Sequence, residues 1–181
     1  HEFRTPLATI QATTDLMMMY RDELGREQCD EYLMHILSEV RHMTDLLDDI
    51  LIFGKGEAGK LIFRPGPIDV DGLAEELIAK YERMAGNADR FRYECQLDEQ
   101  PILDEKLVRL ILSNLISNAL KYSPEEAPVQ IVVRSQQGGT VLEVVDQGIG
   151  IAAEDEADLF QPFHRGVNVG NRSGTGLGLA I

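Results

Sequence analysis

The stretch from Leu110 to Ser123, which reads LILSNLISNALKYS, places the tightest limits on how this chain folds. Asn114 and Asn118 are one helical turn apart, and Lys121 continues the same face. Amide oxygens suit a hard cation such as Mg²⁺, an ammonium suits phosphate, and the ring of Tyr122 suits a flat base. The neighbouring face is apolar at every fourth position and is expected to be buried in the core: Leu107, Ile111, Leu115 and Ala119. The alternative is that the amides only cap backbone groups or face solvent.

Length and charge narrow the class of protein. The chain has 181 residues, of which 44% are hydrophobic, enough for one domain or two small ones with a proper core. Its net charge of −14 repels a phosphodiester backbone, so we expect no binding to nucleic acid. Cys29 and Cys95 are far apart and form no metal-binding spacing, which favours a reduced, cytoplasmic setting. No apolar run approaches the ~20 residues that cross a bilayer.

Residues 1–53 are predicted to form a helical hairpin with a polar break at 21–28. Its second half keeps a strict three-four alternation of apolar residues, the pattern of a coiled coil or four-helix bundle. These residues are Leu33, Ile36, Val40, Met43, Leu47 and Ile50, and they are called the seam below. Two helices alone cannot bury the seam on both flanks, so we expect a homodimer with a four-helix bundle. The alternative is an intramolecular hairpin that packs on the second domain.

Residues 54–67 are rich in glycine and proline and are expected to form a linker or hinge. The spacing of Gly54, Gly59 and Lys60 resembles the start of a P-loop. Leu61 stands where that motif needs a magnesium-binding hydroxyl, and a helix rather than a strand is predicted before it. We therefore reject a P-loop.

Residues 68–181 are predicted to mix helices and strands in an α+β two-layer sandwich. Asp69 or Asp71 is expected to cap a helix, and residues 91–97 alternate as a half-buried strand does. Residues 129–134 and 140–145 predict an antiparallel hairpin that turns at Gly138-Gly139.

Two glycine motifs follow. The first is Asp146-Gln147-Gly148-Ile149-Gly150, in which a carboxylate at a strand end suits the exocyclic amine of adenine. The second is Gly174-Thr175-Gly176-Leu177-Gly178, just before an apolar helical start, which predicts a phosphate cradle made by backbone amides. Residues 162–173 between them are polar and long enough to act as a lid.

Together these motifs resemble the core of a sensor histidine kinase of the two-component type. The resemblance rests on NLISNALKYS, DQGIG, the pair Phe160 and Phe163, and GTGLGLAI, which occur in the order of that family. His1-Glu2-Phe3-Arg4-Thr5-Pro6 resembles the phosphoacceptor box of the family. The fold implied is a dimeric helical hairpin followed by a Bergerat-type ATP-binding sandwich, C-terminally truncated at Ile181, with ATP and Mg²⁺ as cofactors.

The resemblance also implies roles for single residues. Asn118 would ligate Mg²⁺ with Asn114 close by, Lys121 would face phosphate, and Tyr122 would lie against adenine. Asp146 would accept the adenine amino group, and Gly148 and Gly150 would form the pocket floor. Gly174, Gly176 and Gly178 would free backbone amides for the phosphates, with Thr175 and Leu177 lining the loop. Arg165, in the lid, would be a candidate to contact the terminal phosphate.

His1 would then be the nucleophile that attacks the γ-phosphorus of ATP. Glu2 would accept the hydrogen bond of the other nitrogen of the His1 ring. Neighbours on a helix do not face each other, so this pairing needs the helix to bend, and the clash of the Pro6 ring with the carbonyl of Glu2 would cause that bend. The resemblance further implies that Thr5 positions a water when the partner is dephosphorylated. The other histidines, His35, His42 and His164, are not expected to be catalytic. His35 and His42 are expected to face solvent or the flank of the bundle, and His164 is expected to face solvent.

The expected activity is ATP-dependent autophosphorylation of His1 and transfer to an aspartate of a response-regulator receiver domain. The alternatives are a chaperone-type or mismatch-repair-type ATPase, which leaves the box at His1 unexplained, and a non-enzymatic dimerisation module with a decayed pocket. The sensor domain is expected upstream of this fragment. The fragment itself is expected in the cytoplasm, with any membrane anchor in missing N-terminal segments.

Overall fold

The computed structural model describes residues 3–21, 23–86, 88–170, 174 and 176–181. The chain divides into two compact units. The first unit comprises residues 1–61 with the short segments 161–163 and 173–181, and the second comprises residues 62–160 and 164–172. Each unit is described separately below.

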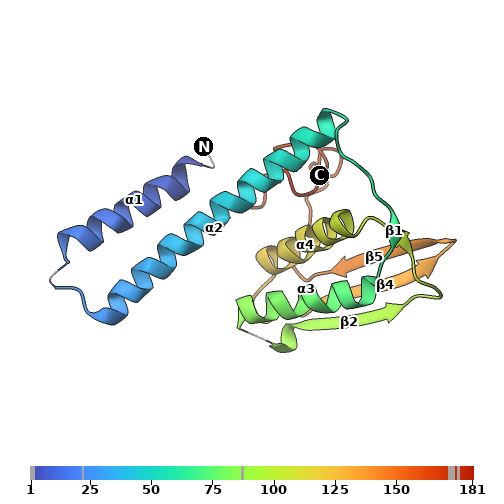
Figure 1. Cartoon of the computed structure of the whole chain (residues 1–181), viewed down its shortest axis with the longest axis horizontal. Helices are drawn as coiled ribbons and strands as arrows, with labels where there is room; N and C mark the ends of the chain where they lie inside the picture. The colour runs from blue at the N-terminus through green and yellow to red at the C-terminus, as the bar shows by residue number, and fades with distance from the viewer. Residues whose placement is uncertain (1–2, 22, 87, 171–173, 175) are drawn as a thin grey trace. The chain divides into compact units, whose positions relative to one another are not determined.

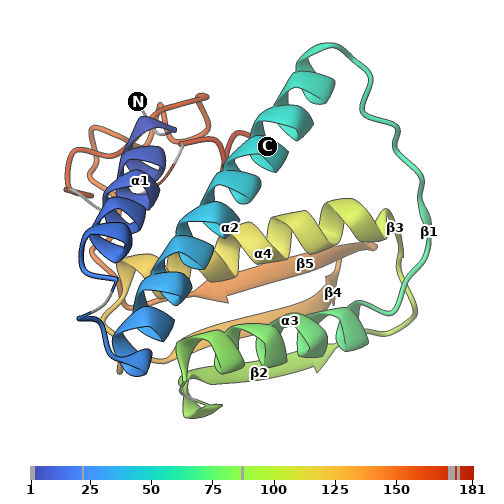
Figure 2. The same cartoon turned by 60° about the vertical axis from the view of Figure 1, so that its left-hand side comes forward.

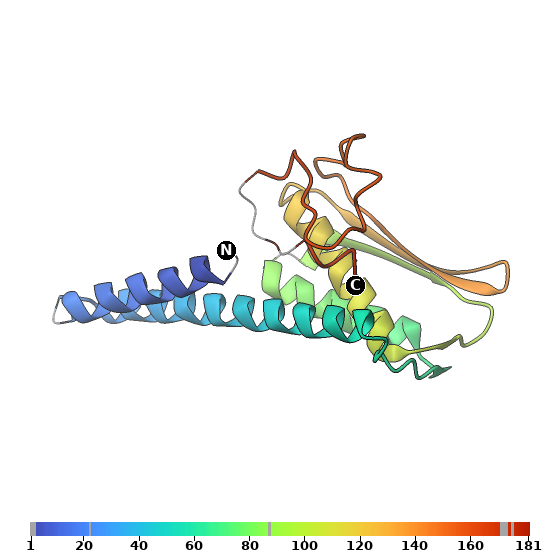
Figure 3. The same ribbon diagram turned by 90° about the horizontal axis from the view of Figure 1, so that it is seen from above.

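The first unit contains a hairpin of two helices, α1 (Arg4–Met19) and α2 (Arg26–Glu57), which lie side by side (Figures 1 and 3). α2 begins after Gly25, whose main-chain nitrogen donates to Oε1 of Gln28 at 3.1 Å. Leu46 is only 3% exposed. Most of the seam is far more open in the single chain: Leu33, Val40, Leu47 and Ile50 are between 38% and 50% exposed. The predicted helical hairpin is confirmed.

The end of α2 corrects one expectation. The helix was predicted to stop near Phe53, but it continues through Glu57, so Gly54 and Gly56 lie inside it. Glycine destabilises a helix by about 1 kcal/mol relative to alanine but does not forbid it, because it keeps its amide donor. The linker proper therefore begins after the helix, and the other predicted domain boundaries stay predictions.

The second unit contains a mixed sheet in the order β2-β4-β5, made of β2 (Phe91–Gln96), β4 (Val129–Gln136) and β5 (Gly139–Val145). β4 and β5 pair antiparallel, as predicted. β2 and β4 pair parallel, with Phe91 opposite Val129, a pairing that the sequence patterns did not predict. The reason is the crossover between them, since a strand followed by a helix returns to the sheet in the same direction. A second, two-stranded sheet pairs β1 (Gly66–Pro67) with β3 (Ile102–Leu103).

The turn between β4 and β5 also differs from the prediction. The turn residues are Gln137 and Gly138, with φ values of 51° and 77°, whereas Gly139 is the first residue of β5. Two consecutive residues with positive φ give the turn geometry whose twist matches that of a hairpin. The prediction of Gly138-Gly139 was therefore displaced by one residue.

Two helices cover one face of the three-stranded sheet (Figure 2). α3 (Val70–Ala85) contacts β2, and α4 (Glu105–Tyr122) contacts β4 and β5. A short 3₁₀ turn (Ala88–Arg90) precedes β2. The core between the layers is formed by Ile68, Val70, Leu73, Ala74, Leu77, Ile78, Phe91, Val108, Leu112, Ile116, Ala119, Val129, Ile131 and Val133. The predicted α+β two-layer fold is confirmed.

The face of α4 that enters this core differs from the one predicted. Val108, Leu112, Ile116 and Ala119 are buried, whereas Ile111 is 46% exposed and Leu107 and Leu115 are only partly buried. α4 is apolar around most of its circumference, so two neighbouring stripes have the same four-residue spacing. Only the position of the sheet decides which stripe is buried.

Candidate functional site

α4 carries the predicted polar stripe, and its start is set by Asp104. The Asp104 carboxylate accepts from the main-chain nitrogens of Lys106 (3.0 Å) and Leu107 (3.3 Å), which caps the helix. It also accepts from the main-chain nitrogen of Arg64 at 2.7 Å. The bond from Arg64 is the largest cause that lowers the pKa of Asp104 below its ordinary value. One carboxylate therefore joins the linker to the first turn of α4.

Asn114 and Asn118 are both partly buried on α4. Asn114 already interacts with another group of the protein, whereas the side chain of Asn118 has no hydrogen-bond partner among the described residues. Ile111, seven residues before Asn118, lies on the same face of the helix and is exposed. An amide oxygen on the same helix face as an exposed apolar side chain provides one hard ligand and one surface for a flat ring.

The end of α4 meets the first glycine motif. The main-chain nitrogen of Ile149 donates to the carbonyl oxygen of Tyr122 at 3.3 Å. The ammonium of Lys121 lies 4.8 Å from the centre of the Tyr122 ring, within the range of a cation–π contact. The amide helix and the glycine motif are thus adjacent, as the sequence predicted for a single site.

Arg90 holds this end of α4 in place, and sequence reasoning missed it. Its side chain is 6% exposed. The guanidinium donates to three carbonyl oxygens, those of Pro124 (2.9 Å), Ala127 (3.2 Å) and Leu120 (3.4 Å). These carbonyls flank Tyr122 in sequence, so Arg90 supports the turn that follows the helix. No motif marks such a residue in the sequence, because its partners are backbone atoms.

Asp146 lies just after β5 and is exposed. Its Oδ1 accepts from the main-chain nitrogen of Gly148 at 2.7 Å and from the hydroxyl of Ser123 at 3.3 Å. Both bonds use Oδ1, so Oδ2 has no partner in the part of the chain that the structure describes. The carboxylate is oriented by the protein and keeps one acceptor oxygen, which suits a donor such as an amino group.

Gly148 fits this corner because it has no side chain. A Cβ atom at position 148 would lie 2.7 Å from Oδ1 of Asp146 and 2.8 Å from the carbonyl oxygen of Tyr122. Both separations are shorter than real contacts, so any side chain would push the motif away from α4. Gly150 is needed for a different reason, since its φ of +67° is a conformation that L-residues rarely adopt.

A buried carboxylate, Asp155, is the second residue that sequence reasoning missed. Asp155 is 4% exposed, and its Oδ1 lies 3.1 Å from Nε2 of His164. Its Oδ2 accepts from the main-chain nitrogen of Val167 at 2.9 Å. His164 was expected to face solvent, but this contact makes it partly buried, with 26% of its side chain exposed. The partial burial of His164 is caused by Asp155, which is nine positions earlier in the sequence and is marked by no local pattern.

Arg165 lies next to His164 and is exposed. Asn168, three residues further on, donates from Nδ2 to the carbonyl oxygen of Gly150 at 3.0 Å and approaches that of Ile149 at 3.4 Å. The segment that carries Arg165 is therefore attached to the first glycine motif. Of the predicted site residues, the structure brings together those of α4, the first glycine motif and this segment.

The second glycine motif belongs to the first unit, so its position relative to α4 is not described. Leu177 is completely buried, and its carbonyl oxygen accepts from the main-chain nitrogens of Ala180 and Ile181. The carbonyl oxygen of Gly176 accepts from the main-chain nitrogen of Phe163 at 3.0 Å. Gly174 and Gly176 have positive φ, as a backbone cradle requires, and Gly178 lies in the turn. Thr175 lies outside the described residues.

Two of the predicted catalytic residues, His1 and Glu2, also lie outside the described residues. Thr5 is exposed in the first turn of α1. Pro6 is the third residue of α1, where its missing N–H has no intrahelical partner to lose. The predicted loosening of the helix by Pro6 concerns the carbonyl of Glu2, which lies outside the described residues.

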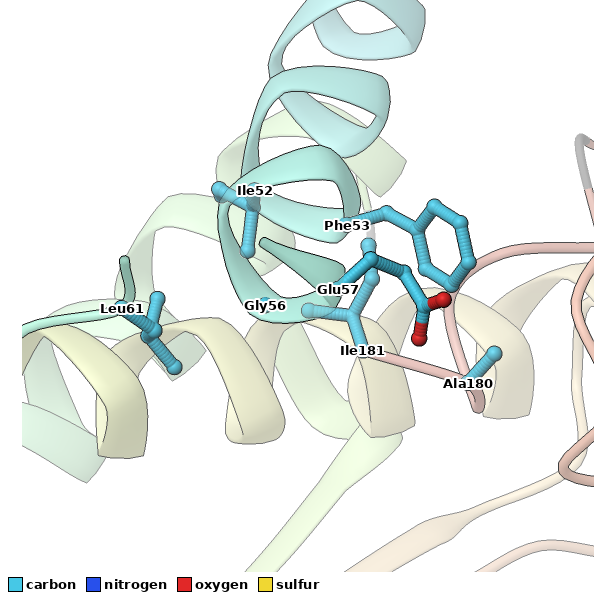
Figure 4. Close-up of a pocket in the computed structure, with 7 residues that line it drawn as sticks. All are labelled: Ile52, Phe53, Gly56, Glu57, Leu61, Ala180 and Ile181. Carbon is cyan, nitrogen blue, oxygen red and sulfur yellow. The ribbon is translucent and has the colours of Figure 1, made fainter. Parts of the chain in front are cut away.

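A small hollow of about 130 Å³ lies in the first unit, between the end of α2 and the last residues of the chain (Figure 4). It contains none of the predicted nucleotide-binding residues. It is lined by Ile52, Phe53, Gly56, Glu57, Leu61, Ala180 and Ile181. Ligand sites usually exceed ~300 Å³. We therefore assign no nucleotide to this hollow.

The described residues contain no group of three His, Cys, Asp or Glu side chains that could hold a metal ion. Mg²⁺ is nevertheless compatible with α4, because Mg²⁺ takes one or two protein oxygens and fills its shell with phosphates and waters. The amide oxygen of Asn118 fits that requirement. None of the described helices has both the length and the apolar character that spanning a membrane requires.

Comparison with known proteins agrees with this arrangement. Residues 1–59 match the His Kinase A (phospho-acceptor) domain, and residues 103–181 match the family of histidine kinase-, DNA gyrase B- and HSP90-like ATPases. The sensor-like histidine kinase SenX3 of Mycobacterium tuberculosis is 29% identical over 184 residues, which cover all of this chain and 44% of SenX3. The chain thus spans less than half the length of this curated relative.

Two solved structures share the fold over nearly the whole chain. Histidine kinase AdeS of Acinetobacter baumannii has a TM-score of 0.74 at 25% identity, covering 99% of this chain and 82% of AdeS. Full-length ShkA, in complex with AMPPNP, has a TM-score of 0.65 at 27% identity, covering 99% of this chain and 37% of ShkA.

Histidine kinase cores consist of a helical hairpin of the phosphoacceptor type followed by an α+β two-layer domain of the ATPase type. The chain belongs to the sensor histidine kinases of two-component systems and carries their phosphoacceptor and ATPase domains.

Proposed function

We propose that this chain is an ATP-dependent histidine autokinase that phosphorylates His1 and passes the phosphoryl group to an aspartate of a response-regulator receiver domain. The observation that supports this most strongly is the corner at which Tyr122, Asp146 and Gly148 meet. This corner combines an aromatic residue, a carboxylate that is oriented by hydrogen bonds, and a glycine whose backbone lies close to the end of α4. Those groups suit an adenine base, and ShkA, which shares the fold, binds the ATP analogue AMPPNP.

In this proposal the residues of the second unit bind and orient ATP. Oδ2 of Asp146 accepts the hydrogen bond of the adenine amino group, and the ring of Tyr122 packs against the base. Asn118 holds Mg²⁺ through its amide oxygen, and the ion supplies charge neutralisation for the phosphates. Asn114 lies close to the Mg²⁺ site. Lys121 and Arg165 provide the local positive charge that an acidic chain otherwise lacks.

The backbone around the glycines completes the phosphate and base contacts. Gly148 and Gly150 form the pocket floor, and the second glycine motif contributes amide donors to the phosphates. We assign these donors to Gly174, Gly176 and Gly178, with Thr175 and Leu177 lining the loop.

The reaction is an in-line displacement at phosphorus. A nitrogen of the neutral His1 ring forms the new N–P bond while the bond from the γ-phosphorus to the bridging oxygen breaks, and ADP leaves. Glu2 accepts the hydrogen bond of the other ring nitrogen and stabilises the cation that develops. Thr5, which is exposed and four residues after His1 in the sequence, is assigned to the dephosphorylation of the partner.

We also propose that the chain works as a homodimer in the cytoplasm, where ATP is available and Cys29 and Cys95 stay reduced. The seam on α2 supports the dimer, because Leu33, Val40 and Leu47 remain about half exposed in the single chain. The relatives are longer than this chain, which leaves room for a sensor domain and a membrane anchor outside it.

The test of this function is transfer of label from γ-labelled ATP to the purified protein in Mg²⁺. We expect a label that is lost in acid and kept in alkali, because the phosphorus–nitrogen bond of phosphohistidine hydrolyses in acid. Steady release of free phosphate with an unlabelled protein would favour a simple ATPase instead, and failure to bind ATP would favour a non-enzymatic module.

A further inference from the structure

Asp155 is a carboxylate that the proposed reaction does not use, yet it is almost completely buried. Removing a carboxylate from water is costly unless hydrogen bonds replace the lost hydration. Asp155 has such bonds, to Nε2 of His164 at 3.1 Å and to the main-chain nitrogen of Val167 at 2.9 Å. Both partners belong to the segment that begins the lid, so Asp155 fixes one side of that segment.

Asn168 fixes the other side. Its Nδ2 donates to the carbonyl oxygen of Gly150 at 3.0 Å, which joins the segment to the first glycine motif. Gly166 lies between the two attachments, where a Cβ atom would be 3.0 Å from Oδ2 of Asp155 and 3.2 Å from Oδ1 of Asn168. The two attachments are therefore close together, and they enclose a short stretch of backbone.

Arg165 is the residue that these attachments place. It lies between His164 and Gly166, its side chain is exposed, and it is the only Lys or Arg from Ser135 to Gly170. In a chain of net charge −14, each cation near the nucleotide has a large influence on which anion is bound. Its effect depends on position, because a guanidinium binds phosphate through directional hydrogen bonds.

We propose that Asp155, His164 and Asn168 are positioning residues that hold Arg165 toward the terminal phosphate and so make the site prefer ATP over ADP. This inference rests on the proposed nucleotide site at α4. The three residues do not touch the nucleotide themselves. They act through Arg165, which contacts only the phosphate that ADP lacks.

The test is the ratio of ATP affinity to ADP affinity in the purified protein, measured with Mg²⁺ by competition against a fluorescent ATP analogue. Arg165→Ala is the reference variant, for which we expect a loss of about tenfold in ATP affinity and little change in ADP affinity. Asp155→Asn keeps the shape of the side chain but weakens the bond to His164, and we expect the same selective loss. Glu154→Gln, an exposed neighbour, is the matched control and should leave the ratio unchanged.

A double variant separates positioning from general support of the fold. If Asp155 acts through Arg165, adding Asp155→Asn to Arg165→Ala should lower ATP affinity no further. Equal losses of ATP and ADP affinity in Asp155→Asn, or additive losses in the double variant, would overturn the inference.

Two further variants keep the inference testable if Asp155→Asn does not fold. His164→Ala and Asn168→Ala each remove one attachment at a partly or fully exposed side chain, and both should lower the ratio as Arg165→Ala does. An unchanged ratio in both would also overturn the inference. Failure of the proposed function is distinguishable, because the wild-type protein would then either bind neither nucleotide or release free phosphate from ATP without becoming labelled.

Discussion

The main-chain nitrogen of Ile149 donates to the carbonyl oxygen of Tyr122 across 3.3 Å, so the end of α4 and the first glycine motif are joined through their backbones. This bond forms where Gly148 passes α4 with no room for a side chain. The close approach places the Tyr122 backbone and the Asp146 carboxylate on either side of Gly148. A change that separates the two backbones should therefore weaken nucleotide binding more than it weakens the fold.

Gly148→Ala makes that change. Its Cβ would lie 2.7 Å from Oδ1 of Asp146 and 2.8 Å from the carbonyl oxygen of Tyr122, so the motif must shift. We expect ATP affinity to fall by about tenfold or more, which corresponds to about 1.4 kcal/mol or more. Titration with a fluorescent ATP analogue measures it. Gly139→Ala is the control, because its Cβ would meet only Gln136 at an ordinary 3.6 Å, and an equal loss there would contradict the explanation.

The buried face of α4 gives a stability prediction. Leu112 is completely buried, so Leu112→Ala should lower the free energy of unfolding by about 2–5 kcal/mol. Ile111→Ala removes a side chain that is 46% exposed and should lower it by about 1 kcal/mol or less. Urea denaturation of both variants measures the difference. The reverse order would mean that the face predicted from sequence is the buried one.

Asp104 gives a dependence of stability on pH. Its folded-state pKa is lowered from an ordinary value of 3.8, chiefly by the bond from the main-chain nitrogen of Arg64. A lowered pKa means that the ionised form is favoured in the folded state, so this contribution is complete above the unfolded pKa and is lost as the pH falls through the folded pKa.

Asp104→Asn should therefore be less stable than the wild type at about pH 7, and the two should converge as the pH falls through the folded-state pKa, where the wild-type side chain also becomes uncharged. Urea denaturation over this pH range measures the difference. Glu99→Gln, at an exposed position, should follow the wild type throughout. A constant difference between wild type and Asp104→Asn would contradict the assignment to charge.

The seam gives a prediction for oligomeric state. Val40 is 46% exposed in the single chain, and a dimer would bury it. Val40→Glu would place a charge in that interface and should raise the dimer dissociation constant by about a hundredfold or more. Analytical ultracentrifugation measures it. Arg41→Glu introduces the same side chain on an exposed position beside the seam and should leave the dimer intact.

The spacing of apolar residues predicted the helical hairpin, α4 and the hairpin of β4 and β5, because each of these spacings fits only one type of secondary structure. It did not select the buried stripe of α4, since Leu107-Ile111-Leu115 and Val108-Leu112-Ile116 repeat with equal spacing and only the sheet distinguishes them. It also missed the parallel pairing of β2 with β4, which depends on a crossover rather than on either strand.

The candidate site was predictable where its residues form a local motif, as in Asp146-Gln147-Gly148. Asp155 and Arg90 were missed because their partners are distant in sequence or are backbone atoms. Such residues become visible only when the fold brings a buried charge next to its partners.

The most direct measurement is label transfer from γ-labelled ATP by the whole protein, compared among wild type, His1→Gln and Asn118→Asp. We predict an acid-labile label on the wild type and none on either variant, with nucleotide binding retained in His1→Gln because the binding site is intact. Undiminished label on His1→Gln would contradict the assignment of His1 as phosphoacceptor, and undiminished label on Asn118→Asp would contradict the site on α4.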